Sequence, residues 1–201
     1  MSLTHRALPA ALAAAALVAL PSTATAAPGS MLPEPLPPVP SLDVERYGGT
    51  WQQIAAIPQP FSLQCARDTR AEYGIIGPGE ISVRNTCTTW TGEQSQIDGT
   101  ARVTDPVTNA ALRVRFPTVP FEIAEEIPNY VVTYVDDDYS LAIVGDPART
   151  SGFVLSRTSS ISTEQWQLVR STIESRGWDS CFFLTSPTAG GLEEIRPLCT
   201  L

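Results

Sequence analysis

The residue types in this chain restrict the chemistry that it can perform. The only histidine is His5, near the N-terminus, and all 13 basic residues are arginines, because the sequence contains no lysine. Ser-His-Asp and Cys-His catalysis, histidine metal sites and lysine Schiff bases each lack an essential residue in the rest of the chain. We therefore expect no metal site and no cofactor, and we predict that the protein is not an enzyme.

The four cysteines, Cys65, Cys87, Cys181 and Cys199, are the remaining reactive side chains. They are separated by 22, 94 and 18 residues and form no C-x-x-C pair, so neither a zinc site nor a thioredoxin-like motif is indicated. An even number of cysteines in an exported chain favours two disulfides. The spacing alone leaves all three pairings open.

The N-terminus has the pattern of a secretory signal. His5 and Arg6 precede the apolar run 7–20, and Ala24-Thr25-Ala26 offers a small-residue cleavage site. We predict a signal at 1–26 and a secreted, extracellular protein. A retained membrane anchor is the alternative, but the run is short and rich in alanine, and no cysteine follows the cleavage site to carry a lipid. No later window reaches the ~18 apolar residues of a membrane span, so no transmembrane segment is expected in the mature chain.

Residues 27–41 contain six prolines and are interpreted as a stiff, extended Pro-rich leader. The remaining ~160 residues are enough for one domain. The chain carries 21 acidic residues and a net charge of −8. An acidic protein of this kind is not expected to bind nucleic acid.

Short apolar runs separated by turn residues predict an all-β protein. The expected strands are 49–57, 67–76, 79–88, 94–104, 109–117, 128–136, 139–146 and 150–157. The clearest alternation is at 112–116, where Leu112, Val114 and Phe116 share one face and the two arginines between them are expected to face water. On the sixth strand the same rule suggests that Tyr130, Val132 and Tyr134 point inward.

One helix is predicted after the eighth strand. Ser162-Thr163-Glu164-Gln165 has the form of a capping box, Trp166, Val169 and Ile173 lie at helical spacing, and Gly177 ends the pattern. Residues 181–184 are expected to form a short ninth strand. An eight-stranded antiparallel up-and-down β-barrel with this C-terminal α-helix and ninth strand would leave no exposed edges, and a Greek-key sandwich fits the pattern equally well.

Three motifs resemble those of the lipocalin family, within the calycin superfamily. Residues 42–55 contain Gly49-Thr50-Trp51, which is similar to the G-x-W motif of the first strand. Asp136-Asp137-Asp138-Tyr139 resembles the second motif and Leu155-Ser156-Arg157-Thr158 the third. Segments 68–73 and 145–147 resemble the subgroup of bacterial lipocalins, plant temperature-induced lipocalins and apolipoprotein D. The resemblance covers 42–187 as a lipocalin domain and leaves 188–201 as a C-terminal tail, which we expect a disulfide to tether.

The resemblance implies a barrel that is closed at one end. Trp51 is expected at that end with the guanidinium of Arg157 packed over its indole, a contact that cation–π attraction favours. Gly49, Asp138 and Tyr139 are the other structural residues of the motifs. Some relatives join a cysteine near the second strand to the C-terminal segment, and this resemblance favours a Cys65–Cys199 disulfide here.

Strand alternation and the resemblance together predict a ligand cavity in the barrel. Alternation from Trp51 places Gln53 and Ala55 inside. The predicted ligand contacts are Gln53, Tyr73, Val83, Asn85, Leu112, Val114, Phe116, Tyr134 and Phe153. The loop 117–128, with Phe121, Glu122, Glu125 and Glu126, is expected at the open mouth of the barrel.

The function predicted from these features is a secreted lipocalin that carries or sequesters a small hydrophobic ligand, such as a fatty acid or a lysophospholipid. One alternative is an enzyme that uses an inward-facing cysteine, for which a free Cys87 thiol is required. Another is a protein-interaction module in which the cavity is incidental, although the sequence indicates no particular protein partner.

Overall fold

The computed structural model describes residues 34–117, 124 and 126–201. The predicted signal lies outside these residues, and so do Phe121, Glu122 and Glu125 of the expected mouth loop. No helix within the described ranges is both long enough and apolar enough to cross a membrane.

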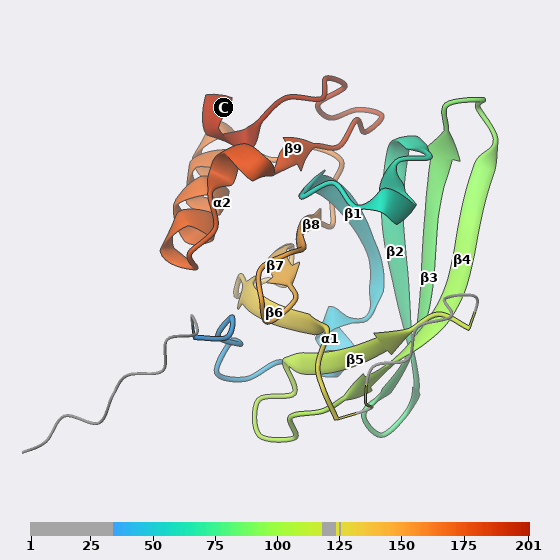
Figure 1. Ribbon diagram of the computed structural model, residues 1–201, viewed down its shortest axis with the longest axis vertical. Helices are drawn as coiled ribbons and strands as arrows, with labels where there is room; N and C mark the ends of the chain where they lie inside the picture. The colour runs from blue at the N-terminus through green and yellow to red at the C-terminus, as the bar shows by residue number, and fades with distance from the viewer. Residues whose placement is uncertain (1–33, 118–123, 125) are drawn as a thin grey trace, which may run out of the picture. The chain divides into compact units, whose positions relative to one another are not determined.

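Eight antiparallel strands form a closed β-barrel (Figure 1). They are β1 (Gly49–Ala56), β2 (Cys65–Gly77), β3 (Glu80–Thr89), β4 (Gln94–Val103), β5 (Ala111–Arg115), β6 (Tyr130–Val135), β7 (Leu141–Gly145) and β8 (Gly152–Ser156). Each strand pairs with the next along the chain, and β1 pairs with both β2 and β8, which closes the sheet. The predicted up-and-down barrel is confirmed. All eight predicted strands begin and end within two residues of the observed ones.

Cross-strand rows divide the side chains of the barrel into an inner and an outer set. Trp51 shares one row with Ala71 and Asn85. Partners in an antiparallel row point to the same face, so the row of the buried Trp51 lines the interior. The inner apolar cluster around Trp51 also includes Tyr47, Ile81, Val83, Ala101, Leu112, Val132, Ala142, Val144 and Leu155.

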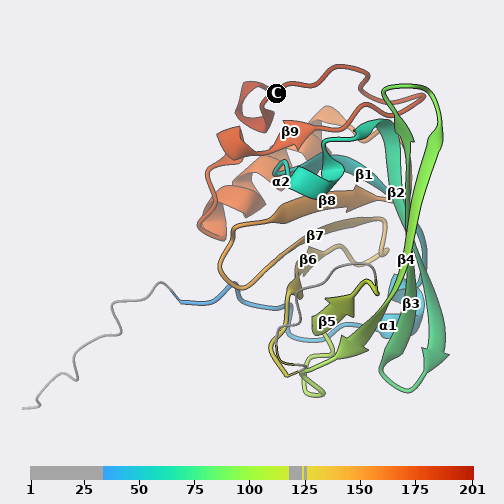
Figure 2. The ribbon, with the colours of Figure 1, turned by 45° about the vertical axis from the view of Figure 1, so that its right-hand side comes forward.

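The helix α2 (Thr163–Ser175) packs on the outer face of the barrel, on the side away from β2, β3 and β4 (Figure 2). Its capping box is confirmed, because the Ser162 Oγ accepts a hydrogen bond from the Gln165 N–H while the Gln165 side chain accepts one from the Ser162 N–H. Val169 and Ile173 are fully buried. They form an outer apolar cluster with side chains of the barrel such as Ile143.

Two β-bulges reverse the predicted direction of residues near strand ends. In β6 the register shifts between Val132 and Tyr134. A bulge adds one residue to a strand, so the side chains that follow it point to the opposite face. Tyr134 therefore packs against the outer cluster, and the prediction that it faces the cavity is wrong. A shift between Gln53 and Ala55 in β1 likewise places Ala55 in the outer cluster.

The ninth strand begins later than predicted. β9 (Leu184–Thr185) pairs with the end of β1. Ser180–Phe182 instead form the short 3-10 helix η2, where the Asp179 side chain accepts a hydrogen bond from the Cys181 N–H. A side chain that binds a main-chain N–H in this way competes with strand pairing. The predicted strand 181–184 therefore overlaps the observed one only at Leu184.

The environment of Arg113 differs from the predicted one, in which its side chain faces water. Leu112 and Val114 belong to the inner cluster, as the alternation of β5 predicts, and Arg115 is exposed. Arg113 lies on the opposite face from its apolar neighbours, yet it is only 5% exposed. Other parts of the protein cover the sheet at that position, which the alternation of a single strand cannot reveal.

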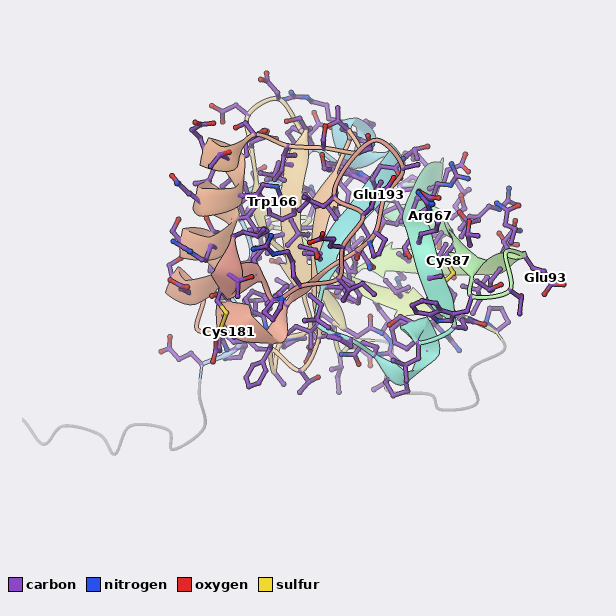
Figure 3. The ribbon with its side chains drawn as sticks, turned by 90° about the horizontal axis from the view of Figure 1, so that it is seen from above. Arg67, Cys87, Glu93, Trp166, Cys181 and Glu193 are labelled. Carbon is purple, nitrogen blue, oxygen red and sulfur yellow. A yellow bond between two sulfur atoms is a disulfide. The ribbon has the colours of Figure 1, made fainter. Side chains whose placement is uncertain are left out.

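Both disulfides join cysteines that are close in sequence (Figure 3). Cys65 in β2 is bonded to Cys87 in β3, and Cys181 in η2 is bonded to Cys199 in the 3-10 helix η3 (Leu198–Thr200). The Cα atoms are 5.6 and 4.9 Å apart in the two pairs, which suits a disulfide. The favoured Cys65–Cys199 pairing is therefore wrong. Pairing of β2 with its neighbour β3 brings Cys87 beside Cys65, whereas the disulfide of Cys199 lies beside α2.

Residues 34–41 of the Pro-rich segment, and Leu42 after them, pack against the barrel. Leu36 is 3% exposed and Leu42 is 2% exposed. The Val39 N–H donates a hydrogen bond of 2.9 Å to the Val132 carbonyl oxygen in β6. Leu36 belongs to the outer cluster, whereas Val39 and Leu42 belong to the inner one. This part of the segment therefore contributes to the core of the domain.

Candidate ligand-binding site

Arg157 closes one end of the barrel. The carbon of its guanidinium lies 3.8 Å from the ring centre of Trp51, which is fully buried. The guanidinium also donates hydrogen bonds to the main-chain carbonyl oxygens of Arg46, Tyr47, Gly48, Thr50 and Tyr139. A planar fork of donors can stack on an indole and still reach several acceptors at its edge. The predicted packing of Arg157 on Trp51 is confirmed.

The short helix α1 (Val44–Tyr47) completes the closed end. The Asp43 carboxylate caps it by accepting a hydrogen bond of 3.0 Å from the Arg46 N–H. The Asp43 N–H in turn donates a hydrogen bond of 2.8 Å to the Tyr139 hydroxyl. The Arg46 guanidinium lies 4.2 Å from the centre of the Tyr139 ring. These contacts join the segment before β1 to the turn between β6 and β7.

The aspartate run forms that turn. The Asp136 carboxylate accepts hydrogen bonds from the main-chain N–H groups of Ser140 and Leu141. Asp137 and Asp138 are exposed. The first acid thus satisfies main-chain donors, and the other two face solvent, as expected of a tight turn.

Eight of the nine predicted ligand contacts face the interior of the barrel, and Tyr134 does not. The eight are Gln53, Tyr73, Val83, Asn85, Leu112, Val114, Phe116 and Phe153. They come from β1, β2, β3, β5 and β8 and from the residue that follows β5, and β3 and β5 each supply two of them.

The inward-facing side chains differ in burial. Val83 and Leu112 are 4% and 3% exposed and belong to the packed part of the interior. Those that keep more accessible surface are Gln53, Tyr73, Asn85, Val114, Phe116 and Phe153. Phe116 follows the end of β5 and Phe153 lies at the start of β8, so both are at the end opposite to Arg157. The barrel interior is therefore closed at one end and accessible near the other.

Gly99 makes room for the Phe116 ring. A Cβ atom at Gly99 would lie 2.6 Å from Cδ1 of Phe116 and 2.3 Å from the Arg115 carbonyl oxygen. Gly99 pairs with Val83, so its Cα faces the interior. The absence of a side chain at this position lets β5 and the aromatic ring approach β4 closely.

Comparison with known proteins identifies the family. A family model described as a lipocalin-like domain matches residues 42–188. The chain belongs to the lipocalin family. Temperature-induced lipocalin-1 of Arabidopsis thaliana is 39% identical over 145 residues, which cover 70% of this chain and 76% of that protein. Outer membrane lipoprotein Blc of Escherichia coli K12 is 33% identical over 156 residues, which cover 75% of this chain and 84% of that protein.

Solved lipocalin structures share the fold. Insecticyanin from the tobacco hornworm Manduca sexta matches with a TM-score of 0.57 and 19% identity, covering 77% of this chain and 85% of that one. Lobster apocrustacyanin A1 matches with a TM-score of 0.55 and 15% identity, covering 78% of this chain and 92% of that one. At these identities the likeness concerns the fold alone.

Three tyrosine hydroxyls meet inside the lipocalin barrel. The hydroxyl oxygen of Tyr130 lies 2.7 Å from that of Tyr47 and 3.1 Å from that of Tyr73. The rings of Tyr47 and Tyr73 are stacked with their centres 5.7 Å apart, and Tyr47 also packs on Trp51. We call Tyr47, Tyr73 and Tyr130 the tyrosine cluster.

The tyrosine cluster is assembled from α1, β2 and β6. The strand patterns and the resemblance pointed to Tyr73 and Tyr130 as inward-facing residues, but they missed Tyr47. The only local signal for Tyr47 is its position directly before Gly48 and the G-x-W motif. Its direction depends on how α1 folds under the barrel, which no periodicity in a four-residue helix can show.

Burial keeps the tyrosine cluster uncharged at ordinary pH. Loss of hydration raises the pKa of Tyr73 to about 12, and burial likewise raises the pKa of Tyr47 and of Tyr130 well above the usual value. The unfolded chain loses these protons near pH 10, whereas the folded lipocalin keeps them. The free energy of unfolding should therefore be unaffected below pH 10 and should fall between pH 10 and about 12, by ~1.4 kcal/mol per pH unit for each buried tyrosine.

This pH dependence can be measured by phenolate absorbance and by urea unfolding at pH 8, 10 and 11. At pH 11 the folded lipocalin should show much less phenolate than the urea-unfolded chain, and Tyr130→Phe should flatten the loss of stability. Equal phenolate absorbance in the folded and unfolded chains at pH 11 would contradict the buried, neutral cluster.

Gln53 links the interior to the C-terminal segment. Its Nε2 donates a hydrogen bond of 2.9 Å to the Ser186 Oγ, and the Ser186 N–H donates one to the Ile54 carbonyl oxygen. Farther along the same segment, Glu193 lies 3.6 Å from the guanidinium of Arg67 in β2, and the two side chains approach each other in Figure 3. The segment after β9 thus bridges β1 and β2.

Two surface pockets, of about 210 and 230 Å³, lie outside the barrel. The first lies between residues 159–161, Trp166 and residues 186–192. The second lies on the outer face of the sheet around Arg70 and Arg84. None of the nine predicted ligand contacts lines either pocket, so neither corresponds to the predicted ligand site.

Proposed function

We propose that this lipocalin binds one small hydrophobic molecule, such as a fatty acid or a lysophospholipid, inside the barrel and carries or sequesters it. The observation that supports this function is the accessible surface of Val114, Phe116 and Phe153, which face inward. Apolar side chains inside a completely filled barrel would keep little accessible surface. An apolar cavity with a few polar groups is the usual form of a small-molecule site.

The wall chemistry fits a ligand that is mostly apolar. The proposed contacts are Gln53, Tyr73, Val83, Asn85, Leu112, Val114, Phe116 and Phe153. Burial of ~500 Å² of apolar ligand surface at ~25 cal/mol per Å² would supply about 12 kcal/mol. After an association cost of ~4–5 kcal/mol, this leaves enough for a micromolar dissociation constant.

We also propose that the protein is exported. The signal pattern supports export, and so does the pairing of all four cysteines in disulfides, which form in oxidising compartments. Among the relatives, apolipoprotein D of Oryctolagus cuniculus is 33% identical over 106 residues, and the Escherichia coli relative is named an outer membrane lipoprotein.

The binding function predicts a specific loss on changing one residue of the wall. Val114→Gln puts an amide into the apolar cavity, where binding a ligand would strip it of water. We expect the dissociation constant of the neutral fluorophore N-phenyl-1-naphthylamine to rise by about tenfold, measured by fluorescence titration. Native mass spectrometry of protein purified without added lipid should also reveal a bound molecule that organic extraction removes.

Val107→Gln is the matched control, because Val107 is 85% exposed in the turn between β4 and β5. This variant should bind the fluorophore like the unmodified protein. Absence of fluorophore binding to the unmodified protein, or an equal loss in both variants, would refute binding in the barrel.

The enzymatic alternative lacks its nucleophile in this structure. Cys87 is bonded to Cys65, so its sulfur is not a free thiol. The binding function therefore remains the proposal that the geometry supports best.

A further inference from the structure

The tyrosine cluster contains more hydrogen-bond donors than it uses internally. Each neutral tyrosine has one O–H proton, and the cluster therefore has three protons. The two contacts of Tyr130, with Tyr47 and with Tyr73, consume two of them whichever oxygen donates in each. Within the part of the chain that the structure describes, the three hydroxyls have no hydrogen-bond partners besides one another. One O–H group is therefore left with no acceptor among the described residues and can donate to an oxygen of a bound molecule.

That donor lies in the barrel interior. Tyr73 and Tyr130 pack with the inner cluster, and both keep accessible surface although they face inward. Tyr73 lies in a row with Val83, and Tyr130 pairs with Leu112. Their partly buried hydroxyls thus lie beside apolar side chains that face the barrel interior. A polar group in such surroundings binds an acceptor strongly, because water competes poorly there.

The environment favours an uncharged acceptor. A carboxylate buried beside neutral hydroxyls would lose its hydration without gaining an opposite charge, which is costly. The cation that acts electrostatically on Tyr47 and Tyr73 is Arg157. Its N–H groups already donate to five main-chain carbonyl oxygens at the closed end.

We propose that the tyrosine cluster donates a hydrogen bond to a neutral oxygen, of a ketone, aldehyde, ester or alcohol, at the deep end of the bound hydrophobic ligand. This inference rests on the proposed binding function and narrows its ligand class. The apolar body of the ligand would lie along Val114, Phe116 and Phe153, and its oxygen would point toward Tyr130. The cluster thereby sets the orientation of the ligand, and burial of the apolar body supplies most of the affinity.

The test uses three probes of similar shape: 2-ethylnaphthalene, its ketone counterpart 2-acetylnaphthalene, and the anion 2-naphthoate. Their dissociation constants are measured by displacement of N-phenyl-1-naphthylamine from the full protein and from Tyr130→Phe. Tyr134→Phe is the matched control, since it removes the same hydroxyl from the same strand but on the outer face. Circular dichroism and urea unfolding establish that each variant is folded.

We expect Tyr130→Phe to raise the dissociation constant of the ketone by about 3- to 10-fold and to change that of 2-ethylnaphthalene by less than twofold. Tyr134→Phe should change neither. The carbonyl stretch of the bound ketone, measured by infrared difference spectroscopy, should lie at lower frequency in the unmodified protein than in Tyr130→Phe, because a hydrogen bond weakens the C=O bond. The infrared shift does not depend on equal stability of the two proteins.

The outcomes separate this inference from the function on which it rests. Failure of the fluorophore and of all three probes to bind would overturn both. Tyr130→Phe leaves the O–H groups of Tyr47 and Tyr73 without their shared partner, so the double variant Tyr73→Phe with Tyr130→Phe is measured beside it. Binding of the ketone with no effect of either variant on its affinity or on its carbonyl stretch would overturn the role of the cluster and leave the binding function intact. If Tyr130→Phe weakened the binding of 2-naphthoate and left the affinity for the ketone unchanged, the preference for a neutral oxygen would be overturned.

Discussion

Arg157→Ala is expected to lower the free energy of unfolding by about 3–5 kcal/mol. The change removes the stacking on Trp51, which is worth ~0.5–2 kcal/mol. It also removes a donor from five carbonyl oxygens at the closed end, of which those of Gly48 and Tyr139 are partly buried and have no second donor among the side-chain hydrogen bonds. A buried carbonyl left without a partner costs ~1–3 kcal/mol before the end relaxes or takes up water. Urea unfolding followed by tryptophan fluorescence measures the loss.

Two further variants test whether the geometry of the Arg157 guanidinium, and not its charge alone, stabilises the closed end. Arg157→Lys keeps the positive charge but has no planar fork, so it should recover only a minor part of the stability. Arg84→Ala removes an exposed arginine that pairs with Asp98 at 2.7 Å, and it should have little effect. A small loss for Arg157→Ala, similar to that of Arg84→Ala, would show that Arg157 does not hold the closed end together.

Removal of each disulfide is expected to cost about 3 kcal/mol. The bonds close loops of 22 and 18 residues, and the chain-entropy model assigns this amount to loops of such length. The double replacements Cys65→Ser with Cys87→Ser, and Cys181→Ser with Cys199→Ser, should therefore have similar effects in urea unfolding. Reduction of both bonds in the unmodified protein should lower its stability by about the sum.

Peptide mapping without reduction checks the pairing directly. Trypsin cleaves after arginine but not before proline, so it should leave Cys181 and Cys199 together in one peptide, 177–201, with an internal bond. The peptide 47–67, which carries Cys65, should be joined to 85–102, which carries Cys87. A bond between 47–67 and 177–201 would restore the long-range pairing and raise the expected effect of its removal to ~4–5 kcal/mol.

The closed end of the barrel could be predicted because its residues stand in three short motifs that resemble those of the lipocalin family, and because stacking of Arg157 on Trp51 is physically favourable. The G-x-W segment, the turn at Asp136 and Arg157 each stand in a short, readable stretch. The wall was harder to predict. Alternation correctly assigned Val114 and Phe116 in β5 but failed for Tyr134, because the bulge in β6 has no signature in the run Val-Val-Thr-Tyr-Val.

The sequence by itself determined the order and bounds of the strands and the capped helix, because alternation, capping and turn formation act over a few neighbouring residues. The residues of the closed end were identified by the resemblance of three short motifs to those of the lipocalin family. The tertiary structure decided which way Tyr134 points, which cysteine Cys65 meets, how Arg113 is covered and where the Tyr47 hydroxyl lies. Each of these depends on strand register or on contacts between segments far apart in the chain. Local pattern carries no information about such contacts, and closure of the barrel establishes them.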